Sequence, residues 1–395
     1  MTMKLDIKKK LLNRSDRVKS VDLHPNLPWV LTALYGGTVM IYDYNSQTQV
    51  RSIEITNAPV RSAKFIARKQ MIVVGSDDNL LRVFNYNTAE KVKTIEEHTD
   101  YIRNIAVHGS QPFVFSCSDD DTIRMFDWEK SWQKVNTFVD HDHYIMQVKI
   151  NPKDPAMFAS ASLDKTIKIW TVGTTKSTAN YTLLGHEAGV NCIDFSPDLE
   201  RPHLVSGSDD GLVKIWDYQT RQCLFTFDQG GHQESVASVA FHPEIPIIIS
   251  GGEDDVVHMW NSQTYKHVNQ LNFGLKRCWS ISAVPENNAV GLGFDEGTIV
   301  IKIGKENPLA AFSNGKVVWV KQNEISTFNL KLLAGADEGS KDGEVVKPQN
   351  VKEMGVSETF VQNIRFAPTG RYFAVIGDND FVIYAYPKFQ NTAFG

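Results

Sequence analysis

The segment Ser208-Asp-Asp-Gly-Leu-Val-Lys-Ile-Trp-Asp217 decides the fold, because versions of it recur along the chain at a nearly constant interval. Each version begins with Ser or Gly and has an aspartate two places later. After two further residues come an aliphatic residue, a basic residue or His, a second aliphatic residue and an aromatic residue. The clear copies begin at Ser76, Ser118, Ser162, Ser208 and Gly252, and weaker copies cover residues 35–43 and 294–301. The shared aspartate falls at positions 78, 120, 164, 210 and 254, which gives a period of about 42 to 46 residues. A fixed period of this length indicates a repeat architecture.

Each period contains four short β-runs. In one period, the apolar run 190–195 leads to a Ser-Pro turn, a second apolar run covers 203–206, and the Lys-Ile-Trp run and 222–227 follow. Turn residues separate these runs, and no segment has the 3.6-residue periodicity of a helix. We therefore predict an all-β protein built as a β-propeller, in which each period forms one four-stranded blade.

Seven inner strands are expected, and one outer strand is missing. The inner strands begin near Val18, Val60, Ile102, Ile145, Val190, Val236 and Trp279. The seventh blade has three strands and ends at residues 298–303, whereas residues 4–11 alternate between apolar and polar residues. Because closing a ring removes open sheet edges, we expect residues 1–304 to form a seven-bladed propeller closed by strand 4–11. The lysines at 8–10 then belong to a solvated outer edge rather than to a nuclear signal.

The repeat becomes illegible after residue 304. Residues 316–321 and 324–330 are strand-like, and residues 360–385 contain one further set of blade runs. The stretch at about 333–350 has few core-forming residues, which predicts a flexible loop. About one and a half blades cannot close a ring. We therefore expect residues 305–395 to be the truncated start of a second propeller and the chain to be a fragment of a longer protein.

Composition excludes several classes of protein. The 395 residues carry a formal charge of −5, which disfavours a protein that coats nucleic acid or an anionic membrane. No apolar run reaches the 18 or so residues of a membrane span. The four cysteines are widely spaced and contain no Cys-x-x-Cys pair, so we expect a reduced, cytosolic protein with buried thiols. The chain has no nucleophile-elbow, phosphate-loop or zinc-protease motif, and we predict no catalytic residue, metal or cofactor.

The repeats resemble the WD-repeat family, which implies a buried frame of hydrogen bonds in each blade. The matching residues are His186 or His232, Ser206 or Ser250, Asp210 or Asp254, and Trp216 or Trp260. We therefore expect structural roles for these histidines and for the aspartates at 78, 120, 164, 210, 254 and 295. A catalytic or metal-ligand role is disfavoured because such pairs recur once per blade, whereas a site needs groups that converge at one place.

Charged residues outside that frame point to a binding site. The turns before the structural aspartates contribute Asp77, Asp119, Asp209 and Glu253, whereas blades four and seven have Leu163 and Phe294 at the equivalent positions. The loops that enter the inner strands contribute Arg17, Lys19, Arg61, Asp100, Arg103 and Arg277. Both sets open onto the same face of a propeller. Any one of them is most simply a solvated turn residue. Arg17, Lys19 and Arg61, however, come from adjacent blades, and three converging cations suit one carboxylate or phosphate.

Segments outside the repeat frame resemble the coatomer beta-prime family. They are residues 13–19, 65–69, 83–88, 100–103, 151–155, 214–220, 246–250, 260–266, 314–319 and 352–355. The resemblance implies a vesicle-coat subunit whose first propeller binds C-terminal dilysine signals, Lys-Lys-x-x or Lys-x-Lys-x-x, of membrane cargo in Golgi-to-ER retrograde transport. It also implies other coatomer subunits, notably alpha, as partners, no nucleic acid, and a peripheral location on the cytoplasmic side of Golgi membranes and coated vesicles.

The same resemblance suggests a role for each charged residue. Arg17, Lys19 and Arg61 would hold the terminal carboxylate, with Tyr35 lining the pocket. Asp100, Asp119 and Asp209 would receive the lysines, and Asp77, Arg103 and Arg277 are second-rank candidates. Leu163 interrupts the ring of acids and leaves the preferred lysine spacing open. The alternative is a generic WD-repeat scaffold that docks an unrelated protein through a merely solvated face, and an enzyme ranks third.

Overall fold

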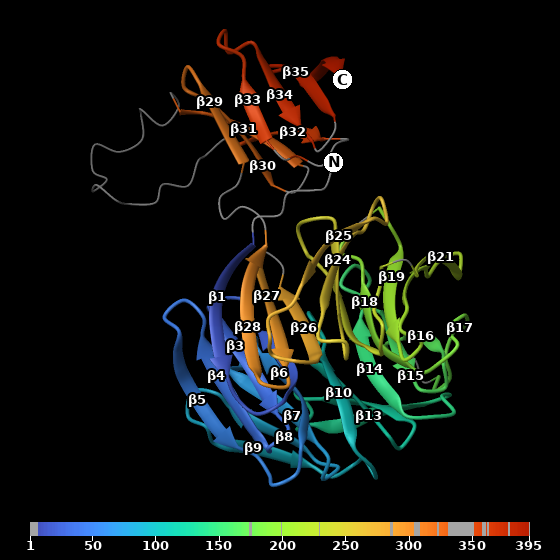
Figure 1. Cartoon of the computed structure of the whole chain (residues 1–395). Coiled ribbons are helices and arrows are strands. Elements are labelled where there is room, and N and C mark those ends of the chain that lie inside the picture. The colour runs from blue at the N-terminus through green and yellow to red at the C-terminus, as the bar shows by residue number, and fades with distance from the viewer. Residues whose placement is uncertain are drawn as a thin grey trace. The chain divides into compact units, whose positions relative to one another are not determined.

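The computed structural model consists of β-strands, and it divides into two compact units (Figure 1). The larger unit is Ile7–Ile303, and the smaller one contains the residues from Gly304 onward. The structure describes residues 7–173, 176–198, 200–228, 230–284, 287–303, 309–321, 324–330, 351–357, 361, 363–377 and 380–394.

The larger unit is a propeller of seven four-stranded antiparallel sheets. Blade one consists of β2 (Val18–Leu23), β3 (Trp29–Leu34), β4 (Thr38–Asp43) and β5 (Thr48–Glu54). Blade two consists of β6 (Val60–Ile66), β7 (Met71–Ser76), β8 (Leu81–Asn85) and β9 (Lys91–Ile95), with the 3-10 turn η1 (Ala67–Lys69) between β6 and β7. Blade three consists of β10 (Ile102–Val107), β11 (Phe113–Ser118), β12 (Thr122–Asp127) and β13 (Gln133–Val139). Blade four consists of β14 (Ile145–Ile150), β15 (Met157–Ser162), β16 (Ile167–Thr171) and β17 (Tyr181–Leu183). Blade five consists of β18 (Val190–Phe195), β19 (His203–Ser208), β20 (Val213–Asp217) and β21 (Gln222–Phe227). Blade six consists of β22 (Val236–Phe241), β23 (Ile247–Gly252), β24 (Val257–Asn261) and β25 (His267–Leu271). The inner strands surround a central axis, and the ring closes where blade seven packs on blade one.

Blade seven uses the first strand of the chain as its outer strand. Its sequence-contiguous strands are β26 (Cys278–Val284), β27 (Asn287–Phe294) and β28 (Gly297–Ile303). Strand β1 (Ile7–Arg14) pairs antiparallel with β28, from Ile7 opposite Ile303 to Arg14 opposite Gly297, with a bulge between Lys9 and Leu11. The described part of this strand extends to Arg14, beyond residue 11 where the segment 4–11 expected from the sequence ends, and residues 4–6 lie outside the described residues.

The core lies between neighbouring blades. In one cluster, Ile169 of β16 packs with Val190 of β18 and Trp216 of β20, so the faces of blades four and five bury each other. The repeated tryptophans Trp170 and Trp216 are each 1% exposed. Fully burying one large apolar side chain contributes about 1.5–3 kcal/mol. The aromatic residue of each repeat is therefore a packing residue.

The polar frame predicted for the blades is present in blades four to six. In blade five, Trp216 Nε1–H donates to Ser206 Oγ over 2.8 Å, Ser206 bonds His186 Nε2 at 2.7 Å, and His186 Nδ1 bonds Asp210 at 2.8 Å. Because a carboxylate only accepts, Nδ1 carries the proton and Nε2 accepts from the serine. Burial alone would raise the pKa of Asp210, but the His186 contact and two backbone N–H groups hold it at about 2.

Blade seven departs from this frame. The expectation that Asp295 belongs to it is wrong, because Asp295 accepts hydrogen bonds from Arg17, Arg277 and the Trp279 indole. No histidine or serine of the described residues bonds its carboxylate. Its turn is shorter than those of the other blades, so this aspartate joins the charged face instead.

The smaller unit contains two four-stranded sheets among the described residues. They are β29 (Leu309–Ser313), β30 (Lys316–Lys321), β31 (Glu324–Asn329) and β32 (Lys352–Val356), and β33 (Asn363–Phe366), β34 (Tyr372–Ile376), β35 (Phe381–Ala385) and β36 (Gln390–Phe394). One apolar cluster joins the two sheets, as blades are joined in the larger unit. This segment therefore has two four-stranded sheets rather than the one and a half expected. The loop predicted at 333–350 lies outside the described residues.

Three of the four cysteines are buried, and Cys223 is exposed. The expectation of buried thiols is wrong for Cys223 because it lies on β21, the outermost strand of blade five. Over the described part of the chain, no helix is long and apolar enough to cross a membrane.

Candidate functional site

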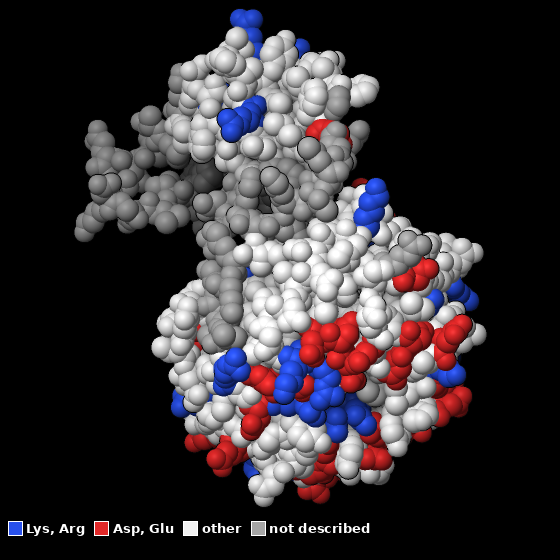
Figure 2. All heavy atoms as spheres, in the orientation of Figure 1, with Lys and Arg blue, Asp and Glu red and all other residues white. Residues whose placement is uncertain are grey.

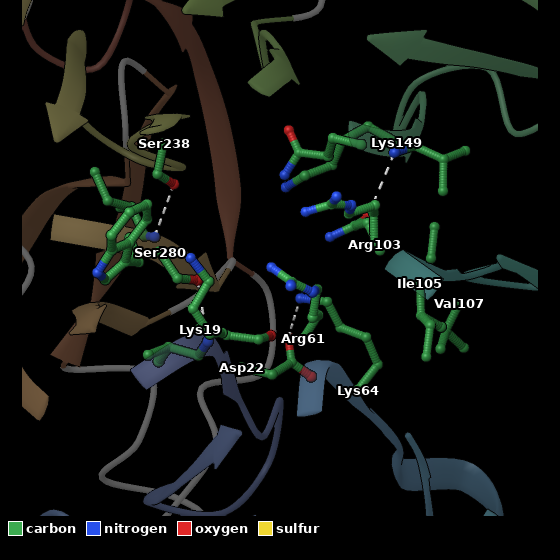
Figure 3. Close-up of a pocket in the computed structure, with 18 of the residues that line it drawn as sticks. Lys19, Asp22, Arg61, Lys64, Arg103, Ile105, Val107, Lys149, Ser238 and Ser280 are labelled. Carbon is green, nitrogen blue, oxygen red and sulfur yellow. Dashed lines mark hydrogen bonds and ion pairs between the residues drawn. The ribbon is translucent and has the colours of Figure 1, made fainter. Parts of the chain in front are cut away.

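A pocket of about 1040 Å³ lies at the centre of the propeller. Seven of the charged or aromatic residues singled out in the sequence as site candidates line it: Arg17, Lys19, Tyr35, Arg61, Arg103, Asp209 and Glu253. Figure 3 shows Lys19, Arg61 and Arg103 extending from three different inner strands into a common space. Basic side chains gather in one patch on the larger unit, with acidic side chains along its border (Figure 2).

A β-bulge near the start of each inner strand places one residue at the pocket. In β2 the pairing with β3 passes from Val18 to Ser20, which leaves Lys19 without a partner opposite it, and β6 and β10 do the same around Arg61 and Arg103. A bulged residue is released from the ladder and its side chain is re-aimed. Around the ring, the seven bulge residues are Lys19, Arg61, Arg103, Met146, Asn191, Ala237 and Trp279, and all of them line the pocket. Blades one to three therefore supply the cations of this ring.

Two of these cations are held by acids of their own blades. Arg61 donates Nε–H and Nη2–H to Asp77 over 2.5 and 2.8 Å, and Arg103 donates likewise to Asp119 over 2.6 and 2.5 Å. Asp119 is only 7% exposed. Such two-pronged contacts fix the guanidinium planes. Asp77 and Asp119 thus position the arginines, and neither carboxylate lines the pocket.

Lys19 is the exception in this ring. None of the ion pairs among the described residues includes it, and its ammonium lies over the Trp279 ring, 3.3 Å from the centroid. Burial, followed by repulsion from Arg61, Arg17 and Arg103, lowers the pKa of Lys19 to about 7. An indole face attracts a cation but carries no charge that cancels it. The pocket therefore holds a positive charge that an anion would stabilise.

Arg17 completes the cationic side. Its Nε–H donates to Asp295 over 2.6 Å, and its guanidinium lies 5.4 Å from the Tyr35 centroid and 5.7 Å from that of Trp279. Tyr35 is 43% exposed. Arg277 also binds Asp295, at 2.8 Å, but it does not line the pocket.

The acidic side is more open. Asp209 is exposed, lines the pocket and accepts one hydrogen bond from Asn191 over 2.6 Å. Asp100 is half-buried and lies outside the lining, where it accepts from the backbone N–H of Tyr101. No described Lys or Arg pairs with either carboxylate. Leu163 lines the pocket between these acids, so its rim is apolar at that point.

The sequence interpretation missed Trp279 and Asn191. Both line the pocket, Trp279 beneath the Lys19 ammonium and Asn191 beside Asp209. It used Trp279 only as the start of a strand. The signal was present in the register, because Asn191, Lys19 and Arg61 each directly follow the first residue of an inner strand.

One group of described residues has the composition of a metal site. One ligand atom each of His232, Asp254 and His258 lies within 4.8 Å of the others. The group belongs to blade six, and none of its members lines the pocket. The pocket itself contains no group of this kind among the described residues; its lining combines cations with the exposed carboxylate of Asp209.

Comparison with known proteins identifies the repeats. The WD domain, G-beta repeat model matches residues 8–43, 89–127, 132–171, 177–217 and 221–261. The whole chain is 52% identical over 396 residues to "Coatomer subunit beta'" of Rattus norvegicus, 52% over 397 residues to that of Drosophila melanogaster, and 51% over 396 residues to "Coatomer subunit beta'-2" of Oryza sativa subsp. japonica. The chain spans 43% of the length of each of these relatives.

Proposed function

Because the chain belongs to the coatomer beta-prime family, we propose that its propeller is the cargo-binding part of a vesicle-coat subunit. Its ligand is the C-terminal tail of a membrane protein that ends in a dilysine signal, Lys-Lys-x-x or Lys-x-Lys-x-x. The observation that carries the proposal is the half-buried ammonium of Lys19, which pairs with no described acid, in a pocket that also contains the carboxylate of Asp209, which pairs with no described cation. Such a tail has one terminal carboxylate and two ammonium groups a few residues apart, so its charges complement both sides.

The terminal carboxylate binds on the cationic side. Lys19 supplies an unpaired charge, and Arg61, already oriented by Asp77, offers guanidinium N–H groups beside it. Arg17 reaches the same pocket from the loop before β2 and packs against Tyr35. Because these donors are held before the ligand arrives, little side-chain freedom is lost on binding.

The peptide lysines bind on the acidic side. Asp209 is the strongest candidate, because its carboxylate is exposed at the pocket and has no cationic partner. Asp100 is second, since it is half-buried but also unpaired with a cation. Asp119 acts mainly through Arg103, whose guanidinium it already binds. With Leu163 at the rim, the acids are spaced unevenly, which limits the lysine spacings that fit.

Affinity for one tail is expected to be modest. A few charge-assisted contacts to a short peptide correspond to a Kd of about 1 to 100 μM, and a coat with many copies raises the effective affinity without new contacts. We further propose that the protein lies on the cytoplasmic side of Golgi membranes and coated vesicles, peripheral to the bilayer, in contact with other coat subunits, notably alpha. In the same proposal, residues 305–395 begin a second propeller, and the pocket binds rather than catalyses.

The test is a calorimetric titration with an N-acetylated peptide ending in Lys-Lys-x-x. The free acid is expected to bind in the micromolar range, and the C-terminal amide at least tenfold more weakly. Lys19→Gln should cause a similar loss, whereas Lys266→Gln, which removes an exposed lysine away from the pocket, should change nothing. Equal binding of acid and amide would refute the carboxylate site and favour a scaffold that docks a different partner.

A further inference from the structure

Each blade contributes one bulge residue and one turn residue to the same end of its inner hairpin. The bulge residue follows the first residue of the inner strand, and the turn residue follows the last residue of the second strand. Backbone hydrogen bonds fix the turn residues, from blade one to blade seven, as Tyr35, Asp77, Asp119, Leu163, Asp209, Glu253 and Asp295. The expectation that Phe294 holds this position in blade seven is wrong, because Phe294 pairs with Cys278 inside the sheet and Asp295 comes directly after it.

In most blades these two side chains match in chemistry. In four blades they hydrogen-bond each other, and the pairs are Arg61–Asp77, Arg103–Asp119, Asn191–Asp209 and Trp279–Asp295. In blade four both residues, Met146 and Leu163, are apolar. An acid in the turn is therefore normally satisfied by a donor on the bulge of its own blade.

Blades one and six break this rule, with opposite sign. In blade one the bulge carries Lys19 but the turn offers Tyr35, so the cation has no acid from its own blade. In blade six the turn carries Glu253 but the bulge residue is Ala237, whose side chain has no hydrogen-bond donor. Both of these blade-six residues line the pocket. The ring therefore has one unmatched cation and one unmatched acid.

Glu253 has one ionic partner among the described residues, and this partner is shared. Arg277 Nη1–H donates to the Glu253 carboxylate over 3.4 Å, whereas Arg277 Nε–H donates to Asp295 over 2.8 Å. A carboxylate accepts about four hydrogen bonds. The Glu253 side chain is 32% exposed, so its remaining acceptor sites are open to a ligand in the pocket.

We propose that Glu253 determines specificity at this site by binding one ammonium group of the ligand, together with Asp209 of blade five. The two blades meet here, because Asn191 donates both to Asp209 over 2.6 Å and to the backbone carbonyl of Val236 over 3.2 Å. An ammonium group has three N–H donors and no acceptor, so carboxylates from two sides satisfy it. Because it assigns a lysine of the cargo tail to these acids, this inference rests on the proposed function.

The order of the blades also fits the arrangement of charges in such a tail. Blade seven packs between blades six and one. Its Asp295 accepts hydrogen bonds from Arg17 and Arg277, so this part of the ring is occupied by internal ion pairs. The carboxylate at Lys19 and the ammonium at Glu253 are therefore held apart, which favours a ligand with uncharged residues between its two charged groups.

The test is calorimetry with an N-acetylated peptide ending in Lys-Lys-x-x and with two analogues in which one lysine or the other is norleucine, which keeps the apolar stem and removes the charge. Glu253→Gln should weaken binding of the dilysine peptide about tenfold. For the analogue that lacks the partner lysine, the same substitution should weaken binding less than about twofold, because the lost interaction is already absent. Glu234→Gln, which changes an exposed acid outside the pocket lining in the loop before β22, should alter none of these affinities.

Ala237→Arg gives a second variant, which fills the same site from within the protein. Arginine is the bulge residue of blades two and three, where it binds the turn acid, so the variant is expected to fold and to occupy Glu253. Binding of the dilysine peptide should weaken at least about tenfold, whereas Ala237→Ser, which supplies no charge, should change it less than about twofold.

The outcomes separate this site from the proposed function. An equal loss in Glu253→Gln for all three peptides, or no loss, would overturn the site even where the free acid still binds more tightly than the C-terminal amide. Equal binding of acid and amide would refute the carboxylate site, whereas coupling between Glu253 and one peptide lysine would still support this one. No saturable binding of the dilysine peptide to the unmodified protein below about 1 mM would overturn both.

Discussion

The affinity of the propeller for a peptide carboxylate should depend on pH through Lys19. The pKa of its ammonium is lowered to about 7 by burial and by the neighbouring guanidinium groups. A bound carboxylate favours the charged form, so it raises this pKa, and binding takes up a proton wherever the free protein has lost it. Affinity is therefore highest below pH 7 and falls as the pH rises.

The size of the effect follows from the two protonation equilibria. If the bound carboxylate restores the pKa of Lys19 to about 10, Kd rises nearly tenfold for each pH unit above 7. Between pH 6.5 and 8.5 the expected weakening is about 20-fold, or about 2 kcal/mol. The same lowered pKa makes the half-buried ammonium destabilising for the free protein, so Lys19→Gln should also raise the free energy of unfolding at pH 7.

Isothermal calorimetry in buffers of different ionisation enthalpy measures both affinity and proton uptake. The peptide is N-acetylated, so that only its carboxylate and lysines are ionised and neither titrates between pH 6.5 and 8.5. In Lys19→Gln the residual affinity should be nearly independent of pH over this range. A flat profile in the unmodified protein, or an equal slope in Lys19→Gln, would refute the role given to this ammonium.

Three further changes probe separate parts of the molecule. Asp209→Asn should weaken binding of a dilysine peptide about tenfold without lowering Tm, and an unchanged Kd would remove this acid from the site. Asp210→Asn should lower the free energy of unfolding at pH 7 by about 1–3 kcal/mol because it breaks the hydrogen-bonded frame of the blade. The pKa of Asp210 is about 2, so this stabilisation is present above pH 4 and is lost as the pH falls through 2. Urea titrations of the variant and the unmodified protein should therefore converge at that pH. Gly293→Ala places a Cβ 2.7 Å from a valine methyl of blade one and should cost about 1–3 kcal/mol, whereas Gly109→Ala, with nothing within 4 Å, should be nearly neutral in the same denaturation assay.

The fold was readable from the sequence because the same local chemistry is repeated. The spacing of Asp120, Asp164 and Asp210 gave the blade period, and alternation along each run gave the strands. The predictions that proved wrong concern residues at which the chain departs from the repeat. Asp295 sits in a shortened turn and pairs with arginines, and Cys223 lies on an outer strand that no neighbour covers.

The sequence indicated which charged residues belong to the pocket, but it did not indicate which side chains contact each other there. The convergence of Arg17, Lys19 and Arg61 on one pocket follows from the ring order of the blades. The sequence could not reveal that Asp119 is bound by Arg103 or that Trp279 lies beneath Lys19, because both depend on where bulges turn the side chains. Which acid pairs with which base around the ring depends on how the folded strands and their bulges orient the side chains.

The closure of blade seven by β1 also has a consequence in time. Arg14 and Glu296, which pair at one end of this closure, are 282 positions apart in the chain. At a translation rate of about 5–20 residues per second, β1 leaves the ribosome roughly 15–60 s before its partner strand exists. During that interval six blades can form from neighbouring sequence, while the first strand stays an unpaired edge open to other chains. The last step in the assembly of this propeller is thus timed by synthesis of the seventh blade, and until then β1 lacks the strand that pairs with it.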